Sequence, residues 1–517
     1  MESKEGSGGM GGDVRPLFDV NNILYEDTPP LSVSTAKQLK EYIPSGNAEW
    51  ELGEEPIRIL VPTGQAFVDT KASYLSFEVE FRGFADPVPL TLAELRPCLP
   101  ADGSWADVFR ETTCTHSSGV EIDRTVDSGV WNSIKMTFAR SREYRETVAA
   151  PLFNQDADAG QSVVNEHYYK NGSTFADIDG AKHTHNIYPA EMSTQDASHG
   201  LNPATTNIND LRPQVVIPMH ELLPLWNPTG GRLMPPQLAA GQVIDLETYD
   251  MHTFFQFTKT LPTIFPPTAQ VFIRNLRVNI MTYTMTDSVL RAVAEQSMMN
   301  GLAYSWKSIH TMTANHRETS FSMQVSTALS RVDSLIVKSR TWDDVYGADR
   351  TYANSFSSNL QLNDLIYNKT QAGAPGLKPI QGRCESMQCQ IGSLYLPSQP
   401  LDNTTKFYHS AMEAMGMFRL PEDQGASLGV PLERFTGRFT VSSAGVGNRF
   451  TSCVGVAALS IASSPTLPES GLSISPQRSA VLDLIYTNPS GVQRLYNLFL
   501  VHSKSCELRA DSILVFS

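Results

Sequence analysis

The chain has 517 residues, of which 41% are hydrophobic and 18% charged, and its formal net charge is −14. This composition is that of a folded chain long enough for two domains with sizeable cores, and it excludes an intrinsically disordered protein. The negative charge argues against a protein whose main role is direct binding of nucleic-acid phosphates.

The start of the chain and its cysteines bear on where the protein is made. Residues 1–13 are polar and glycine-rich, without the apolar centre of a secretory signal, and no run approaches the ~18 apolar residues that a membrane span needs. The six cysteines form no CxxC pair and no Cys/His set with zinc spacing. We therefore expect reduced, partly buried thiols, a state that fits the cytosol or nucleus.

The first 50 residues are expected to hold a flexible arm, residues 1 to about 30, and a short helix. Ser34 could cap this helix over residues 35–42, which would stop near Pro44. Beyond this point, short segments of alternating polar and apolar residues predict β-strands. The clearest is residues 74–81, in which Leu75, Phe77, Val79 and Phe81 share one face.

Further strand patterns in the first half fall at residues 57–61, 134–138, 215–217, 243–246, 254–257 and 271–280. In the second half they fall at 321–325, 335–337, 387–391, 439–441, 454–456, 482–484, 498–500 and 513–515. Long irregular stretches interrupt them at 141–213, 341–383 and 414–434. Loops of this length inside a compact unit are uncommon and usually functional.

The segment 287–301 separates the two strand-rich halves and has a helical pattern. Asp287 can cap its N-terminus and Gly301 can end it, while Leu290, Val293, Ala294 and Met298 form one apolar stripe. The halves also end alike, because residues 243–246 (VIDL) resemble 481–484 (VLDL), and 274–278 (RNLRV) resemble 509–513 (RADSI). We interpret this as a duplicated β-unit with a bridging helix.

Each half holds about eight short strands, and no pattern of alternating helices and strands indicates a parallel sheet. The predicted fold is all-β, with two consecutive eight-stranded antiparallel jelly rolls, long inserted loops and a linking helix. The expected divisions are an arm and short helix over 1–50, a first roll over 51–286, the helix over 287–301 and a second roll over 302–517.

The strongest candidate for an enzymatic site is a set of possible metal ligands, His183, His185 and Glu191. An HxH pair followed by a glutamate is similar to a cupin metal motif, and cupins are jelly rolls. The spacing to Glu191 is too long, Pro189 interrupts the strand and the flanks are polar, so a surface loop explains these residues better. No nucleophile elbow, phosphate loop, HExxH or GxGxxG motif occurs. We predict no catalytic residues, no metal and no cofactor.

Two other groups of residues could form binding sites. The aromatic residues Trp226, Phe254, Phe255 and Phe257 could form a sugar-binding platform, although their strand-like context favours a core or an interface. The basic cluster Arg140, Arg142 and Arg145 is diluted by Glu143 and Glu146, and it is too weak to predict nucleic-acid binding.

Three stretches give the chain a family resemblance: residues 67–79 (FVDTKASYLSFEV), 217–226 (IPMHELLPLW) and 390–401 (QIGSLYLPSQPL), the last followed by Tyr408 and Met412. With the two-unit plan over about 50–517, they resemble the double jelly-roll major capsid proteins of double-stranded DNA viruses. The polinton-like virus, virophage and adintovirus branch is the most similar, and adenovirus hexon is more distant.

The resemblance implies a structural subunit of a virion. Three copies would form a homotrimer with six similar rolls, and this pseudo-hexameric capsomer would tile an icosahedral shell. Expected partners are neighbouring capsomers, a penton or vertex protein and minor capsid proteins, without direct nucleic-acid binding; membrane contact stays open. The alternatives are a carbohydrate-binding β-sandwich or attachment protein and a bicupin-like metalloenzyme.

Overall fold

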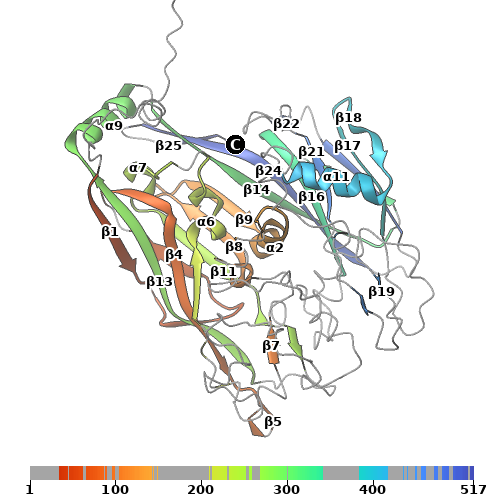
Figure 1. The fold of residues 1–517 in the computed structure, drawn as a ribbon, viewed down its shortest axis with the longest axis horizontal. Helices are drawn as coiled ribbons and strands as arrows, with labels where there is room; N and C mark the ends of the chain where they lie inside the picture. The colour runs from red at the N-terminus through yellow and green to blue at the C-terminus, as the bar shows by residue number, and fades with distance from the viewer. Residues whose placement is uncertain are drawn as a thin grey trace, which may run out of the picture.

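A computed structural model gives the fold as two β-units lying side by side, with the chain passing from one to the other through a single exposed helix (Figure 1). The structure describes residues 34–44, 46–61, 64, 66–86, 88–89, 96–98, 104–141, 144, 148, 209, 212, 214–229, 232–251, 256–258, 268–299, 301–318, 320–325, 327–341, 383–416, 435, 439–440, 449–450, 456–461, 471–474, 480–487, 493–509 and 513–516.

The first unit consists of two antiparallel sheets. One sheet has the order β1 (Ser34–Tyr42), β13 (Gln270–Met285), β4 (Phe67–Arg82) and β10 (Gln214–Pro218), and β2 (Glu49–Glu51) also pairs with β13. The other sheet has the order β3 (Ile57–Leu60), β11 (Val243–Thr248), β8 (Phe109–Thr115) and β9 (Glu121–Val126). We number only the strands of these two sheets in chain order, with β1 and β2 sharing the first place. The first sheet then has the order 1-8-3-6 and the second 2-7-4-5, which is jelly-roll topology.

The second unit repeats this topology. Its first sheet has the order β14 (Leu302–His316), β24 (Arg494–Leu508), β16 (Leu329–Thr341) and β21 (Ala457–Ser460). Its second sheet has the order β15 (Ser320–Val325), β23 (Ala480–Thr487), β17 (Arg383–Ile391) and β18 (Leu394–Leu401). The strands again run 1-8-3-6 and 2-7-4-5, so the fold is a double jelly roll.

Short strands extend this framework: β5 (Ala85–Asp86) pairs with β6 (Val88–Pro89), β7 (Arg96–Cys98) with β12 (Gln256–Thr258), β19 (Phe439–Thr440) with β20 (Arg449–Phe450), β22 (Leu472–Ile474) with β16, and β25 (Ile513–Phe516) with β24. The helical elements are η1 (Trp105–Val108), α2 (Ser128–Phe138), α6 (Met219–Leu222), η7 (Pro224–Trp226), α7 (Pro236–Ala239), α9 (Asp287–Met299) and α11 (Thr404–Ala414). None of the described helices is both long and apolar enough to cross a membrane.

Alternation explains the strands. Along β4, Leu75, Phe77, Val79 and Phe81 are buried between the sheets, as their period-2 spacing predicts.

The expected bridging helix is α9, but its apolar stripe is hardly covered, since Ser297 is its one buried residue in the structure. Of the two sequence matches between the halves, 243–246 and 481–484 lie on equivalent strands, β11 and β23. The other match is not equivalent, because residues 274–278 lie inside β13 and 509–513 follow the end of β24.

Two element predictions were wrong. Residues 35–42 form the edge strand β1, because backbone pairing with β13 overrides the helix propensity of a lysine- and glutamine-containing segment. Residues 134–138 belong to helix α2, whose buried residues Val130, Ile134 and Phe138 recur every four positions. Over five residues, Ile134, Met136 and Phe138 fit a strand equally well, and only the longer window shows the helical period.

Candidate assembly site at the junction between the two rolls

The three possible metal ligands, His183, His185 and Glu191, lie outside the described residues. Within the part of the chain that the structure describes, no group of three His, Cys, Asp or Glu side chains is placed to hold a metal ion. Trp226 is a core residue, since it is fully buried and its Nε1 donates to Oε1 of Gln242 at 3.0 Å. Cys114, Cys389 and Cys506 are buried free thiols, as expected of reduced cysteines.

The two rolls meet along β9 of the first and β14 of the second. The Ser308 hydroxyl donates to Oδ1 of Asp123 at 2.5 Å, although the two residues are 185 positions apart. Three residues further along both strands, the Thr311 hydroxyl donates to the Val126 carbonyl at 2.7 Å. The strands therefore run in the same direction, and side chains rather than a backbone ladder join them.

A second set of contacts lies beside the first part of β14. The backbone N–H of Thr229 donates to the Ser305 carbonyl at 2.9 Å, and the Tyr304 hydroxyl donates to the Leu225 carbonyl at 3.0 Å. Tyr304 and Trp306 are buried here. Residues 217–226, one of the stretches that carry the family resemblance, thus contribute directly to the junction.

Helix α2 covers the outer face of the second roll's first sheet. The Trp131 ring lies 5.8 Å from the Phe499 ring of β24, measured between centroids. At the helix start, Oδ2 of Asp127 accepts from Nδ2 of Asn497 at 2.6 Å. Asp127 has a φ of +53°, a left-handed conformation that aspartate tolerates better than most residues, and it lets the chain turn from β9 into the helix.

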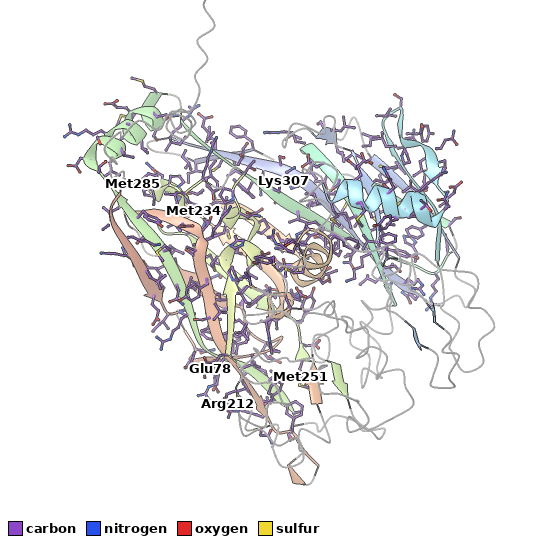
Figure 2. All side chains as sticks on the ribbon, in the orientation of Figure 1. Glu78, Arg212, Met234, Met251, Met285 and Lys307 are labelled. Atoms are coloured by element: carbon purple, nitrogen blue, oxygen red, sulfur yellow. The ribbon has the colours of Figure 1, made fainter. Side chains whose placement is uncertain are left out.

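Charged groups at the junction are held out of water. Burial raises the pKa of Asp123, and Lys504, whose Nζ is 3.6 Å from Oδ1, opposes this effect together with Ser308. Burial lowers the pKa of His502 to about 4, with Lys504 and His310 adding to the shift. Lys307 of β14, labelled in Figure 2, pairs with Asp333 of β16 across β24. Because buried charges are costly without partners, the Asp123–Lys504 pair, whose members come from different rolls, favours one arrangement of the rolls.

Glu221 holds helix α2 in place from the first roll. Its carboxylate is 3.1 Å from Lys135 Nζ and 2.8 Å from Arg140 Nη2, and it accepts from the Tyr144 hydroxyl at 2.9 Å. Burial by itself raises the pKa of Glu221, but Lys135, His220 and Arg140 outweigh burial and hold the pKa well below its usual value. Arg140, considered above as part of a basic cluster, is thus a structural partner of a buried acid.

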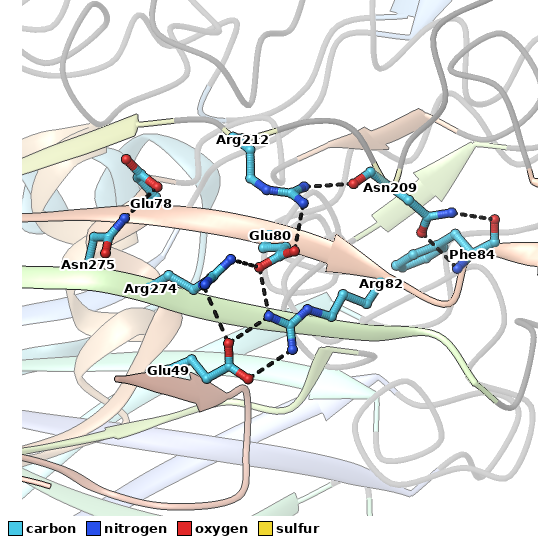
Figure 3. A network of polar contacts seen from close by, with 9 residues as sticks. All are labelled: Glu49, Glu78, Glu80, Arg82, Phe84, Asn209, Arg212, Arg274 and Asn275. Atoms are coloured by element: carbon cyan, nitrogen blue, oxygen red, sulfur yellow. Dashed lines mark hydrogen bonds and ion pairs between the residues drawn. The ribbon is translucent and has the colours of Figure 1, made fainter. Parts of the chain in front are cut away.

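A polar network occupies the outer face of the first roll's first sheet (Figure 3). Glu80 accepts from Arg212 at 2.6 Å, from Arg82 at 2.8 Å and from Arg274 at 2.6 Å. The hydrogen bond from Arg82 is the main cause that lowers the pKa of Glu80. Asn209 bonds the backbone of Phe84, just after β4, so Asn209 and Arg212 from the long stretch 141–213 are both anchored beside this sheet.

These groups are suited to holding surfaces together. The buried carboxylates Asp123, Glu221 and Asp333 each face a cation, and Asp107, whose pKa burial raises to about 7, accepts from both the backbone N–H and the hydroxyl of Ser104. Sequence reasoning did not identify Asp123, Lys504 or Glu221 as site residues. Glu221 lies within residues 217–226, one of the stretches that carry the family resemblance, whereas Asp123 lies in an ordinary polar strand sequence.

No protein-family model matches the sequence, and no curated protein matches it. Solved structures do match its fold. A chain in the cryo-EM structure of the Sputnik virophage has a TM-score of 0.57 at 8% identity, over 94% of this chain and 89% of that one. The mavirus major capsid protein has 0.50 at 9%, over 92% and 89%. The Faustovirus major capsid protein has 0.50 at 9%, over 97% and 94%.

Proposed function

We propose that this chain is the major capsid protein of an icosahedral double-stranded DNA virus and that it acts as a structural protein rather than an enzyme. One observation carries the proposal: a single chain holds two rolls of identical strand order, fixed side by side through β9 and β14. A subunit of two like wedges is what a shell needs to build six-sided units from three copies. The fold shared with the mavirus and Faustovirus major capsid proteins supports this reading.

In the proposed capsomer, three copies close into a homotrimer with pseudo-hexameric outline. The first roll would comprise residues 51–286 with β1 and β2 added to its sheet, the linking helix 287–301, and the second roll 302–517. The stretches 141–213, 341–383 and 414–434 would face outward and toward neighbours, and residues 1–30 would lie beneath the shell. Neighbouring capsomers, a penton or vertex protein and minor capsid proteins would be the partners, in a virion assembled in the host cytoplasm or nucleus.

The test is the state of the purified full-length chain. Light scattering is expected to give a trimer, and negative-stain microscopy a hexagonal particle. A stable monomer at micromolar concentration would refute the proposal. Metal analysis separates it from the bicupin alternative, because stoichiometric iron, manganese or zinc that is lost in His183→Ala would favour an enzyme.

A further inference from the structure

One end of the molecule carries exposed apolar side chains on α9 and β25. Met298 and Met299 of α9 are the most exposed large apolar side chains among the described residues, at 73% and 81%. On β25, Leu514 is 40% exposed and Phe516 is 47% exposed. We call these four side chains the α9–β25 patch. Single exposed apolar residues are common on proteins, whereas a group of them marks a surface that something covers.

Backbone contacts bring the end of α9 to β25. The Ser297 hydroxyl donates to the Leu508 carbonyl at 3.3 Å, and Leu508 pairs with the first residue of β25. Beyond the helix, a Cβ at Gly301 would lie 2.6 Å from Cγ of Glu507, which is the strand partner of Leu514. Figure 1 shows α9 and β25 at the same end of the molecule. The members of the α9–β25 patch therefore lie around one part of the surface.

The chain that precedes β1 enters the fold at this same end. Ser34, the first residue of β1, pairs with Met285 of β13, and α9 begins two residues later, at Asp287. In Figure 1, β1 and β13 meet the start of α9 at this end. Residues 1–33 are therefore joined to the fold beside the first turn of α9.

Residues 1–33 contain one segment that is rich in apolar residues. In residues 14–25 (VRPLFDVNNILY), seven of twelve are apolar or aromatic: Val14, Leu17, Phe18, Val20, Ile23, Leu24 and Tyr25. The charges of Arg15 and Asp19 cancel within the segment. The flanking residues 1–13 are polar and glycine-rich, and residues 26–30 (EDTPP) are polar or proline. A neutral apolar segment between polar flanks gains free energy by covering an apolar surface.

The apolar segment is close enough to reach the whole α9–β25 patch. The eight residues 26–33 between it and β1 span up to about 26–29 Å when extended. Helix α9 has 13 residues and is about 20 Å long. So short a tether holds the segment at an effective concentration on the order of millimolar beside the patch. A weak contact is then sufficient, and the segment of the same chain is favoured over that of a second copy.

We propose that residues 14–25 of each chain dock on the α9–β25 patch of the same chain. The contact covers the two methionines and the apolar residues of β25 in the free subunit, and it holds the N-terminal residues at this end of the molecule. Methionine side chains suit such a contact because they are flexible and adapt to differently shaped apolar partners. The inference goes beyond the proposed function, since it requires neither a trimer nor a shell.

The experiment compares the full-length wild-type chain with two full-length variants. Leu17→Asp/Phe18→Asp, the disrupted variant, places charges on apolar positions of the segment. Asn21→Asp/Asn22→Asp is the matched control, because it adds the same charge at polar positions of the same segment. All four positions precede β1, so unchanged melting temperatures are expected and check that the two rolls are intact.

The readout is the rate at which dilute hydrogen peroxide oxidises Met298 and Met299, measured by peptide mass spectrometry. Because oxidation of methionine follows exposure, both should react at least about fivefold more slowly in the wild type and the control than in the disrupted variant. Met415, which follows α11 in the second roll, is the internal reference and should react at one rate in all three proteins. Equal rates for Met298 and Met299 in the wild type and the disrupted variant would overturn the inference.

A second measurement identifies the chain that supplies the segment. A benzophenone amino acid is placed at the position of Phe18, the protein is irradiated, and the products are separated on a denaturing gel and mapped. A crosslink within one chain to residues 287–299 or 513–516 is expected. A crosslink between two chains, or no crosslink to these residues, would overturn the inference. Neither measurement depends on the trimer, so a failure here is distinct from a failure of the proposed function.

Discussion

Removal of the Glu221 charge tests how strongly helix α2, and with it the junction, depends on one buried ion. The change is Glu221→Gln, which keeps the shape of the side chain and an oxygen that can accept from the Tyr144 hydroxyl. Lys135 and Arg140 then lose the carboxylate that faces them at 3.1 and 2.8 Å. The Glu221 side chain is 1% exposed, so water cannot replace the lost partner.

The expected cost is about 3–5 kcal/mol of unfolding free energy, the usual result of breaking a buried ion pair by removing one member. Burial already lowers the pKa of Lys135, so this group can release its proton and keep the cost near the lower end. Arg140 cannot lose its charge in this way, because a guanidinium stays protonated. For a unit the size of one roll, the melting temperature should fall by roughly 6–20 °C.

The assay is urea unfolding of the wild-type protein and the Glu221→Gln variant at several pH values, with Glu247→Gln as the control variant. Glu247 pairs with Arg110 at the surface, where removal should cost less than about 1 kcal/mol. The pKa of Glu221 is lowered in the folded state, so its contribution is complete above the ordinary value of 4.5 and is lost as pH falls through the folded pKa. The gap between wild type and Glu221→Gln should therefore shrink below pH 4.5. A gap below about 1 kcal/mol at neutral pH would refute this account of the buried ion.

Three further predictions follow from other sites. Burial lowers the pKa of His502 to about 4, so as pH falls this imidazole is protonated in the unfolded chain before it is protonated in the folded one. The unfolding free energy should therefore fall by up to about 3 kcal/mol between about pH 6.5 and pH 4. His502→Phe should remove that part of the acid sensitivity in urea titrations, and an unchanged acid profile would contradict it. Gly83→Ala should destabilise by at least about 2 kcal/mol more than Gly119→Ala, because both glycines have positive φ but a Cβ at Gly83 would lie 1.9 Å from the Thr268 carbonyl oxygen, while the space at Gly119 is open. Thermal melts of the two variants compare them directly, and equal losses would count against the clash. Cys114, Cys389 and Cys506 should resist a thiol reagent at neutral pH, since burial raises the pKa of each thiol, to about 12 for the last two; rapid labelling of any of them in peptide mass mapping would argue against their burial.

The strands were predictable because each has one face toward a core and one toward water or a covering element. Residues 74–81 show this alternation plainly, and they lie in β4 with the apolar set buried. The alternating pattern does not predict the element correctly where the segment is short, or where pairing with a neighbouring strand decides the secondary structure. Residues 134–138 satisfy two periods at once, and β1 is a strand only because β13 offers it a partner.

The junction was not predictable from the sequence, for a physical reason. Asp123 and Ser308 meet across 185 positions, and which residues face each other depends on how two finished sheets are set side by side. A local pattern reports the face of a strand, not the identity of what lies opposite. The role of Glu221 could not be predicted from the sequence either, because its partners Lys135, Arg140 and Tyr144 come from a distant part of the chain.

In the proposed trimer, the internal junction between the rolls forms before any contact between copies. The internal junction is made once, as the chain folds, so it can enclose charges such as Asp123 and Lys504 that would be costly to strip of water at a later step. Contacts between copies in the proposed trimer can form only after folding, so the surfaces that make them must stay in water until then. On the outer edge strands β1 and β18, Leu39 and Tyr395 are about half-exposed among polar residues. Under the proposed function, buried ions suit the permanent contact within a chain, and half-exposed apolar residues suit contacts that form between folded copies.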